Sequence, residues 1–159
     1  MAEKYFYSTL REVTFSVEEN IEDAIIVDID GTLAHMNGKR GPYEENKVLV
    51  DDPDPEVILS VFAEKNYLNR TVIVMSGRHE TCQEDTEKWL KQYGVPYDHI
   101  FMRKADDNRS DDIVKYELFM EHVAGKFNVK KIYDDRDQVC SMWRHLLKLK
   151  VFAVAEGNF

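Results

Sequence analysis

Residues 24–33, with the sequence AIIVDIDGTL, constrain the fold of this chain more than any other stretch. The unbroken apolar run 24–27 is rich in β-branched residues and is typical of a strand buried on both faces of a parallel sheet. Side chains alternate along a strand, so Asp28 and Asp30 are expected on the same side at its carboxyl end, where open α/β sheets bind ligands. Gly31 then allows a sharp turn that leaves its backbone N–H open to an anion.

The proximity of Asp28 and Asp30 itself indicates chemistry. Two carboxylates this close repel each other unless a cation or a shared proton lies between them. The alternative is an ordinary Asp-Gly turn without a chemical role. We consider it the weaker interpretation, because the five-residue pattern from Asp28 to Thr32 follows a strand of the right kind.

The rest of the chain alternates between predicted strands and helices. Further strands are expected at 71–75, 100–102, 130–133 and 151–154, and helices at about 55–67, 81–93, 111–123 and 139–147. Short connections between them predict right-handed βαβ units, and hence a doubly wound α/β fold with a mostly parallel sheet and helices on both faces. Residues 35–47 contain two glycines and a proline and are expected to form a small flap beside the Asp pair, with no large cap domain.

We expect residues 21–159 to form one domain, while residues 1–20 form an extension whose structure the sequence leaves undecided. Helical spacing predicts two buried stripes, at positions 57, 58, 61 and 62 and at positions 113, 116, 120 and 123, with Lys115 off the second stripe. Trp89 is expected in the core.

Composition limits the function classes. A net charge of −9 argues against general binding of nucleic acid through basicity, although it leaves room for a local basic pocket. The sequence contains neither a run long enough to span a membrane nor the apolar core of a signal peptide. The two cysteines, Cys82 and Cys140, show no metal-binding spacing and predict thiols in a reducing, cytoplasmic setting.

Polar groups also follow two other predicted strands. Ser76-Gly77-Arg78 comes after the strand at 71–75, and Asp134-Asp135-Arg136 comes after the strand at 130–133. Taken singly, the first could be a plain turn and the second a helix cap. Because the carboxyl ends of parallel strands share one edge of the sheet, these groups should instead converge on the Asp pair. A serine hydroxyl and a backbone N–H can hold a phosphate oxygen, and clustered carboxylates suit Mg²⁺.

Taken together, Asp28-x-Asp30-Gly31-Thr32, Ser76, Lys115 and Asp134-Asp135 resemble the four motifs of the haloacid dehalogenase (HAD) superfamily of phosphohydrolases, with its Rossmann-like fold. The chain is similar, more narrowly, to the 3′-phosphatase domain of phage-type polynucleotide kinase-phosphatases. That similarity is carried by residues 28–34, 36–38, 40–43, 76–78, 111–115, 134–136 and 142–144. The phosphate-binding loop of that family's kinase domain does not occur in the sequence, so 5′-kinase activity is not expected.

The resemblance implies a role for each matching residue. Asp28 would be the nucleophile and Asp30 the general acid and base. Mg²⁺ would be held by Asp28, the Asp30 carbonyl and Asp134, with Asp135 at or behind it. The phosphate would be bound by Gly31, Thr32, Ser76, Gly77 and Lys115, and the substrate strand by Arg78, Arg103 and Arg136, while the flap would place Met36, Asn37, Lys39 and Arg40 nearby.

The implied reaction is removal of a 3′-terminal phosphate, or opening of a 2′,3′-cyclic phosphate, at DNA or RNA ends during nucleic-acid repair. One alternative is a HAD phosphatase acting on free nucleotides or small phosphometabolites. Another is a phosphate-binding module without turnover, which Asp30 argues against, because binding alone needs no acid for the leaving group. The sequence leaves the oligomeric state open, with a homodimer among the options.

Overall fold

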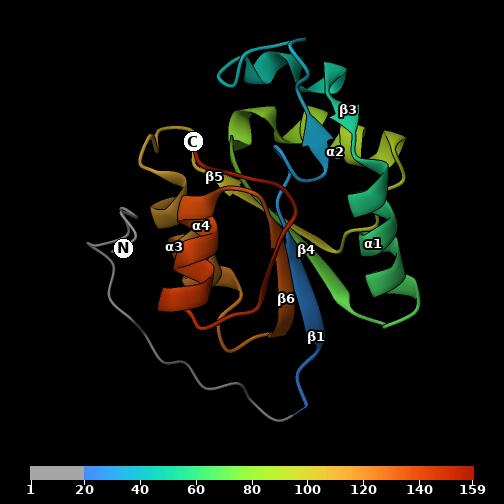
Figure 1. The fold of residues 1–159 in the computed structure, drawn as a ribbon, viewed down its shortest axis with the longest axis vertical. Helices are drawn as coiled ribbons and strands as arrows, with labels where there is room; N and C mark the ends of the chain where they lie inside the picture. Colours follow the sequence, from blue (N-terminus) through green and yellow to red (C-terminus); the bar gives the residue numbers. More distant parts are fainter. Residues whose placement is uncertain (1–19) are drawn as a thin grey trace.

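The computed structural model describes residues 20–159, and its centre is a parallel sheet of five strands (Figure 1). In spatial order the strands are β5 (His99–Arg103), β4 (Thr71–His79), β1 (Asp23–Val27), β6 (Asn128–Asp134) and β7 (Val151–Ala153). The first strand along residues 20–159, β1, is thus central, and the strand order runs outward from it in both directions. Ligand sites of open α/β sheets lie at such a switch point. The predicted doubly wound α/β fold is confirmed.

Both faces of the sheet are covered by helices, as the apolar run in β1 predicted. Ile25 and Val27 point to one face, where they pack with α1 (Pro55–Asn66) and α2 (Gln83–Gln92). Ala24 and Ile26 point to the other face, toward α3 (Asp111–His122), α4 (Asp137–Ser141) and the π-helical turn η3 (Met142–Leu146). All four side chains are almost completely buried. Trp89, as predicted, is a core residue.

The insert after β1 forms a flap above the carboxyl edge of the sheet (Figure 1). It consists of the short antiparallel strands β2 (Ala34–His35) and β3 (Asp52–Pro53) and the 3-10 helix η1 (Glu45–Val50). The indole N–H of Trp89 donates to the Asp51 carbonyl at 2.9 Å and so ties the flap to α2. The small insert beside the Asp pair is therefore confirmed.

The buried stripes of α1 and α3 differ from the prediction. In α3 the buried apolar side chains are Val114, Leu118 and Phe119, while the predicted positions 113, 116 and 120 are only partly buried. Lys115, predicted to lie off the stripe, is itself buried and 3% exposed, so the face that α3 turns to the sheet differs from the predicted one. In α1, Phe62 was expected in the core but is 46% exposed.

Other boundaries shift slightly. Strand β4 extends past Met75 to His79, and the following helix begins with the 3-10 turn η2 (Glu80–Cys82). Both cysteines are buried, and burial raises the pKa of the Cys140 thiol to about 12. Among residues 20–159, no helix has the length and apolar character needed to cross a membrane. The undecided extension, apart from Asn20, lies outside the described residues.

Candidate active site

Asp28 lies directly after β1 and is 5% exposed. Its Oδ1 accepts a hydrogen bond from the Lys115 ammonium at 2.7 Å, and its Oδ2 accepts one from the Thr32 hydroxyl at 3.2 Å. Lys115 comes from the second turn of α3, on the opposite side of the sheet edge from the flap. The lysine that sequence alone would place on a solvated helix face is therefore part of the site.

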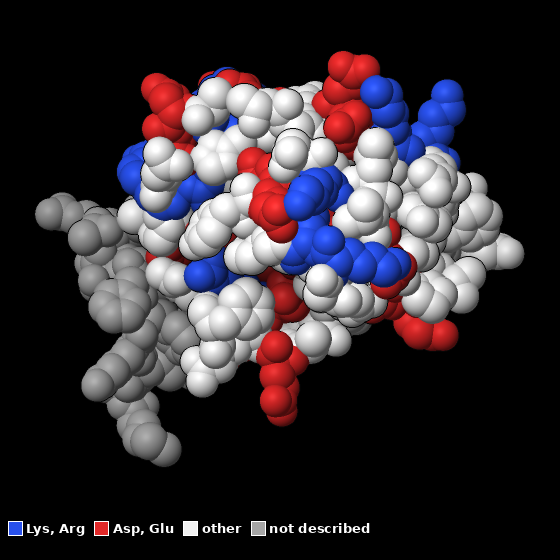
Figure 2. Space-filling view, turned by 90° about the horizontal axis from the view of Figure 1, so that it is seen from above, with Lys and Arg blue, Asp and Glu red and all other residues white. Residues whose placement is uncertain are grey.

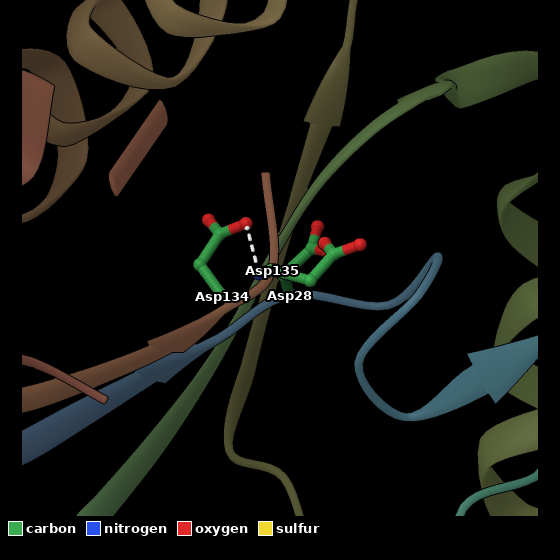
Figure 3. Close-up of side chains that lie close together, drawn as sticks. All are labelled: Asp28, Asp134 and Asp135. Carbon is green, nitrogen blue, oxygen red and sulfur yellow. Dashed lines mark hydrogen bonds between the residues drawn. The ribbon is translucent and has the colours of Figure 1, made fainter. Parts of the chain in front are cut away.

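Asp134 and Asp135 lie at the end of β6, the strand beside β1 (Figure 3). The same Lys115 ammonium donates to Asp134 Oδ2 at 2.8 Å, and the Trp143 indole N–H donates to that oxygen at 3.2 Å. One carboxylate oxygen from each of Asp28, Asp134 and Asp135 lies within 4.8 Å of the others. Three buried carboxylates thus lie close together, and one ammonium group is bonded to two of them, Asp28 and Asp134.

The electrostatics of this cluster follow from burial. Burial raises the pKa of Asp28 well above its usual range; Lys115 opposes the rise, and the charges of Asp134 and Asp135 add to it. Burial and the neighbouring Asp134 likewise raise the pKa of Asp135. For Lys115, burial favours the neutral amine, but Asp134 and Asp28 outweigh it and raise the pKa above the usual value. The ammonium is therefore charged at neutral pH.

The carboxylate cluster fits a divalent cation. Its donors are oxygens of the kind that Mg²⁺ prefers, and they outnumber the single positive charge beside them. The backbone at Gly31 closes tightly over one donor, since a Cβ at Gly31 would lie 2.0 Å from Asp135 Oδ2. Gly31 also has φ +80°, a conformation that glycine adopts without strain. The turn after β1 thus leaves room for the Asp135 carboxylate beside Asp28.

Asp30 belongs to a second network, formed with two arginines. Arg78 donates to both of its oxygens, from Nε at 3.0 Å and from NH2 at 2.6 Å, and Arg40 of the flap donates at 3.1 Å. Burial alone would raise the pKa of Asp30, but Arg78 and Arg40 outweigh it and hold the pKa below its usual value. In this arrangement Asp30 is ionised at neutral pH.

Asp51, which the sequence did not single out, holds the two arginines in place. Its carboxylate is fully buried and accepts from Arg40 Nε and NH2, both at 2.7 Å, and from Arg78 NH2 at 2.8 Å. Breaking such a buried network leaves uncompensated charges inside the protein. Sequence alone could not identify Asp51, because an acidic run in a flap is usually solvated.

We expect Asp51→Ala to lower the free energy of unfolding by about 3–5 kcal/mol, because Arg40 and Arg78 lose their buried counter-charge. Asp52→Ala is the matched control: its carboxylate is 40% exposed and pairs with Lys39, so its loss should cost less than about 1 kcal/mol. Urea unfolding of both variants measures the difference. Equal losses would show that the buried network contributes nothing beyond a surface ion pair.

Ser76 and Gly77 lie within β4, where the pairing with β5 shifts register between Ser76 and His79. Such a bulge redirects side chains at a strand end. The Ser76 hydroxyl lines the cavity and also accepts from the Arg78 backbone N–H at 3.2 Å. A Cβ at Gly77 would lie 2.6 Å from Asp111 Oδ1, so a larger residue would displace the Asp111 carboxylate.

The arginines expected to bind substrate are largely engaged with the protein itself. Arg78 is 2% exposed, and Arg103 is 6% exposed and donates to the Gly77 carbonyl at 2.6 Å. Arg103 and Arg136 both pair with Asp111, Arg136 at 2.8 Å. Only Arg136, with its side chain 32% exposed, is well open to solvent. Arg78 and Arg103 thus bond to neighbouring groups of the protein while also lining the cavity, and their contact with substrate stays a prediction.

These groups border one cavity of about 520 Å³ at the carboxyl edge of the sheet. Of the predicted site residues, ten line it: Asp28, Asp30, Ser76, Gly77, Arg78, Arg103, Lys115, Asp134, Asp135 and Arg136. Gly31 and Thr32 lie behind it, against Asp135 and Asp28. Figure 2 looks onto this edge from above, where basic and acidic side chains lie close together.

The flap contributes differently from the prediction. Met36 lines the cavity and Arg40 reaches Asp30, whereas Asn37 and Lys39 bond to Asp52 at the surface. Several further residues line the cavity without having been predicted as site residues: Tyr43, His79, Arg109, Asp111 and Phe159. Asp111 entered the sequence argument only within the similarity over residues 111–115, with no role of its own. Its contacts with Arg103 and Arg136 depend on how α3 packs beside β5.

Comparison with known proteins gives the family. Residues 22–159 match the family described as the polynucleotide kinase PNKP phosphatase domain. A protein of Autographa californica nuclear polyhedrosis virus, whose assigned name is that of a bifunctional polynucleotide kinase/RNA ligase, is 34% identical over 140 residues. That alignment covers 87% of this chain but 20% of the viral protein.

Solved structures agree. A chain in the structure of the Pnkp1/Rnl/Hen1 RNA repair complex has 38% identity and a TM-score of 0.86, covering 92% of this chain and 47% of that one. The present chain therefore spans about half of that relative's length. The class C acid phosphatase from Bacillus anthracis, at 18% identity and a TM-score of 0.57 over 76% of this chain and 54% of that one, shares the fold.

Proposed function

Because the chain belongs to the family of PNKP phosphatase domains and is thus a HAD-type phosphatase, we propose that it removes the 3′-terminal phosphate from DNA or RNA ends in two steps. The observation that carries the proposal is the pairing of Asp28 with Lys115, within a buried carboxylate cluster, at the floor of a cavity open to solvent. The relatives named for polynucleotide kinase and RNA repair support a strand end as substrate.

In the first step, an oxygen of Asp28 attacks phosphorus, the bond to the sugar oxygen breaks, and an aspartyl-phosphate forms. Lys115, held 2.7 Å from Asp28, places its charge where the phosphate oxygens gather negative charge. Ser76, which lines the cavity, adds a hydroxyl group to the phosphate site. The backbone N–H of Gly31, expected to be open to an anion, instead donates to the Ala34 carbonyl at 2.8 Å. A 2′,3′-cyclic phosphate could be opened by the same attack.

In the second step, water attacks the aspartyl-phosphate and Asp30 accepts its proton. The low pKa that Arg78 and Arg40 give Asp30 suits this role as a base. In the first step Asp30 must be protonated, because it donates a proton to the departing sugar oxygen. Arg78 and Arg40 disfavour the protonated carboxyl. A phosphate dianion bound nearby would raise the pKa of Asp30, because a like charge favours the protonated carboxyl.

Asp28, the Asp30 carbonyl, Asp134 and Asp135 would hold Mg²⁺, which would supply positive charge between the attacking carboxylate and the phosphate.

We expect activity to disappear in EDTA and to return with Mg²⁺. Ca²⁺ should compete without restoring full rate, because it accepts longer bonds and looser geometry. Phosphate-release rates with each ion measure the metal requirement, and thermal unfolding midpoints with each ion measure metal binding. Full activity after EDTA treatment and dialysis would contradict the metal assignment.

A phosphate-release screen tests the substrate. It compares 3′-phosphorylated oligonucleotides, 5′-phosphorylated oligonucleotides, mononucleotides and sugar phosphates, with DNA and RNA versions of the first. We expect the 3′-phosphorylated ends to give the highest kcat/KM. Faster hydrolysis of 5′-mononucleotides would favour the alternative, a HAD phosphatase for small phosphate esters. The small flap, with no large cap among residues 20–159, leaves room for a strand end at the cavity.

A further inference from the structure

Two exposed aromatic side chains lie at the cavity and have no place in the phosphate chemistry. Tyr43 of the flap is 95% exposed and Phe159 is 71% exposed, and both line the cavity that holds Asp28. The other large apolar side chains that are exposed within residues 20–159 do not line it. Building on the proposed function, we propose that Tyr43 and Phe159 stack on the nucleobases next to the terminal phosphate and so select strand ends over small phosphate esters.

The position of Tyr43 is set by the catalytic network. Tyr43 lies in the turn Gly41–Glu44, where the Glu44 backbone N–H donates to the Gly41 carbonyl at 3.1 Å and the Gly41 N–H donates to the Glu44 carboxylate at 2.7 Å. Arg40, which reaches Asp30, also donates to the Gly41 carbonyl at 3.2 Å. The turn is thus anchored to the site, while its aromatic ring is left in solvent.

Phe159 is anchored from the opposite end of the chain. Arg136 donates from Nε to the Phe159 carbonyl at 3.1 Å, and its guanidinium lies 5.4 Å from the centre of the Phe159 ring. Gly157, two residues before Phe159, is held near the end of β6, because the Asp137 N–H donates to the Gly157 carbonyl at 3.0 Å. The ring therefore stands beside a partly exposed cation next to Asp135.

This arrangement has the features of a binding site for single-stranded nucleic acid. Such sites combine basic groups, which follow the backbone phosphates, with aromatic faces on which bases stack. The cavity supplies two partly exposed cations, Arg109 and Arg136, which pair with acidic neighbours in the structure. Among residues 20–159, the apolar lining of the cavity consists of Met36, Pro42, Tyr43 and Phe159. Since every base has a π-face, stacking would favour nucleotides without selecting a sequence.

The test compares two 3′-phosphorylated oligonucleotides that differ only in the bases of the last two nucleotides, which are present in one and removed in the other. We expect the wild-type protein to prefer the substrate with bases by about 5- to 150-fold in kcat/KM for each stacked base. Tyr43→Ala and Phe159→Ala should each reduce this preference, mainly by raising KM for the substrate with bases. Both variants should leave kcat/KM for glycerol phosphate close to the wild-type value. Tyr43→Phe and Phe159→Tyr keep a ring and should retain the preference.

Tyr67→Ala is the matched control, because Tyr67 is 81% exposed but lies after α1, away from the cavity. A binding measurement accompanies the kinetics: 2-aminopurine as the terminal base should lose fluorescence on binding to Asp28→Asn protein and should not when Tyr43 and Phe159 are both alanine. An unchanged base preference in the alanine variants, or no loss of fluorescence with the intact rings, would overturn the proposal. Release of phosphate from both oligonucleotides would leave the 3′-phosphatase function standing in that case, whereas release from neither would contradict that function itself.

Discussion

Asp28→Asn is expected to lower phosphate release by at least about 10⁴-fold, because the amide keeps the shape of the carboxylate but cannot form the acyl-phosphate bond. Acid-quenched wild-type protein should carry a mass increase of one phosphoryl group, and the variant should carry none. Steady-state kinetics with a 3′-phosphorylated oligonucleotide and intact-protein mass spectrometry measure the two effects.

Asp23→Asn is the matched control, since Asp23 begins the same strand but lies at its opposite, exposed end. Its stability and activity should stay close to wild type, because surface substitutions of this kind change little. Circular dichroism and thermal unfolding should show that both variants fold. A folded Asp28→Asn protein with normal turnover in the presence of Mg²⁺ would rule out Asp28 as the nucleophile.

Lys115→Met is expected to have the second largest effect, because Lys115 is the one ammonium group bonded to both Asp28 and Asp134 within residues 20–159. Its removal leaves buried carboxylates without compensation and should lower the free energy of unfolding by about 3–5 kcal/mol. It should also lower kcat by about 10²–10³-fold, since a fixed positive charge at the phosphate is lost.

The two effects of Lys115→Met can be separated with Mg²⁺. A cation that binds the folded carboxylate cluster stabilises that state, so Mg²⁺ should raise the unfolding midpoint more in Lys115→Met than in wild type, while kcat stays low. Lys126→Met, an exposed lysine just after α3, serves as the control and should change neither quantity. An unfolding midpoint equal to that of wild type without Mg²⁺ would contradict the compensating role of Lys115.

The sheet and the core of the site could be predicted because they follow from local patterns. The apolar run before Asp28 requires burial on both faces, and the alternation of strands and helices leaves few topologies. Once the strands are parallel, Asp28, Ser76 and Asp134 must meet at one edge. Their convergence is a consequence of topology and does not depend on the details of packing.

The partners of these residues could not be predicted, because they depend on how distant segments pack. Asp30 meets Arg78 across 48 positions of sequence and Arg40 through the fold of the flap. No role in the site was predicted for Asp51 or Asp111 from the sequence, and only the tertiary structure shows that they pair with arginines. For the same reason, the bonds of Arg103 to the Gly77 carbonyl and to Asp111 could not be predicted.

Lys115 shows most clearly which properties of the site follow from sequence and which depend on tertiary packing. Its spacing from the Asp pair and Ser76 suggested a role in the phosphate site, while helical periodicity placed it outside the buried stripe. Sequence determined which residue types arrive at the carboxyl edge of the sheet, since the end of each strand and the alternation of its side chains are local properties. The rotation of α3, which buries Lys115 between Asp28 and Asp134, was decided only by tertiary packing, because a helix with apolar residues on several sides can turn more than one face to a sheet.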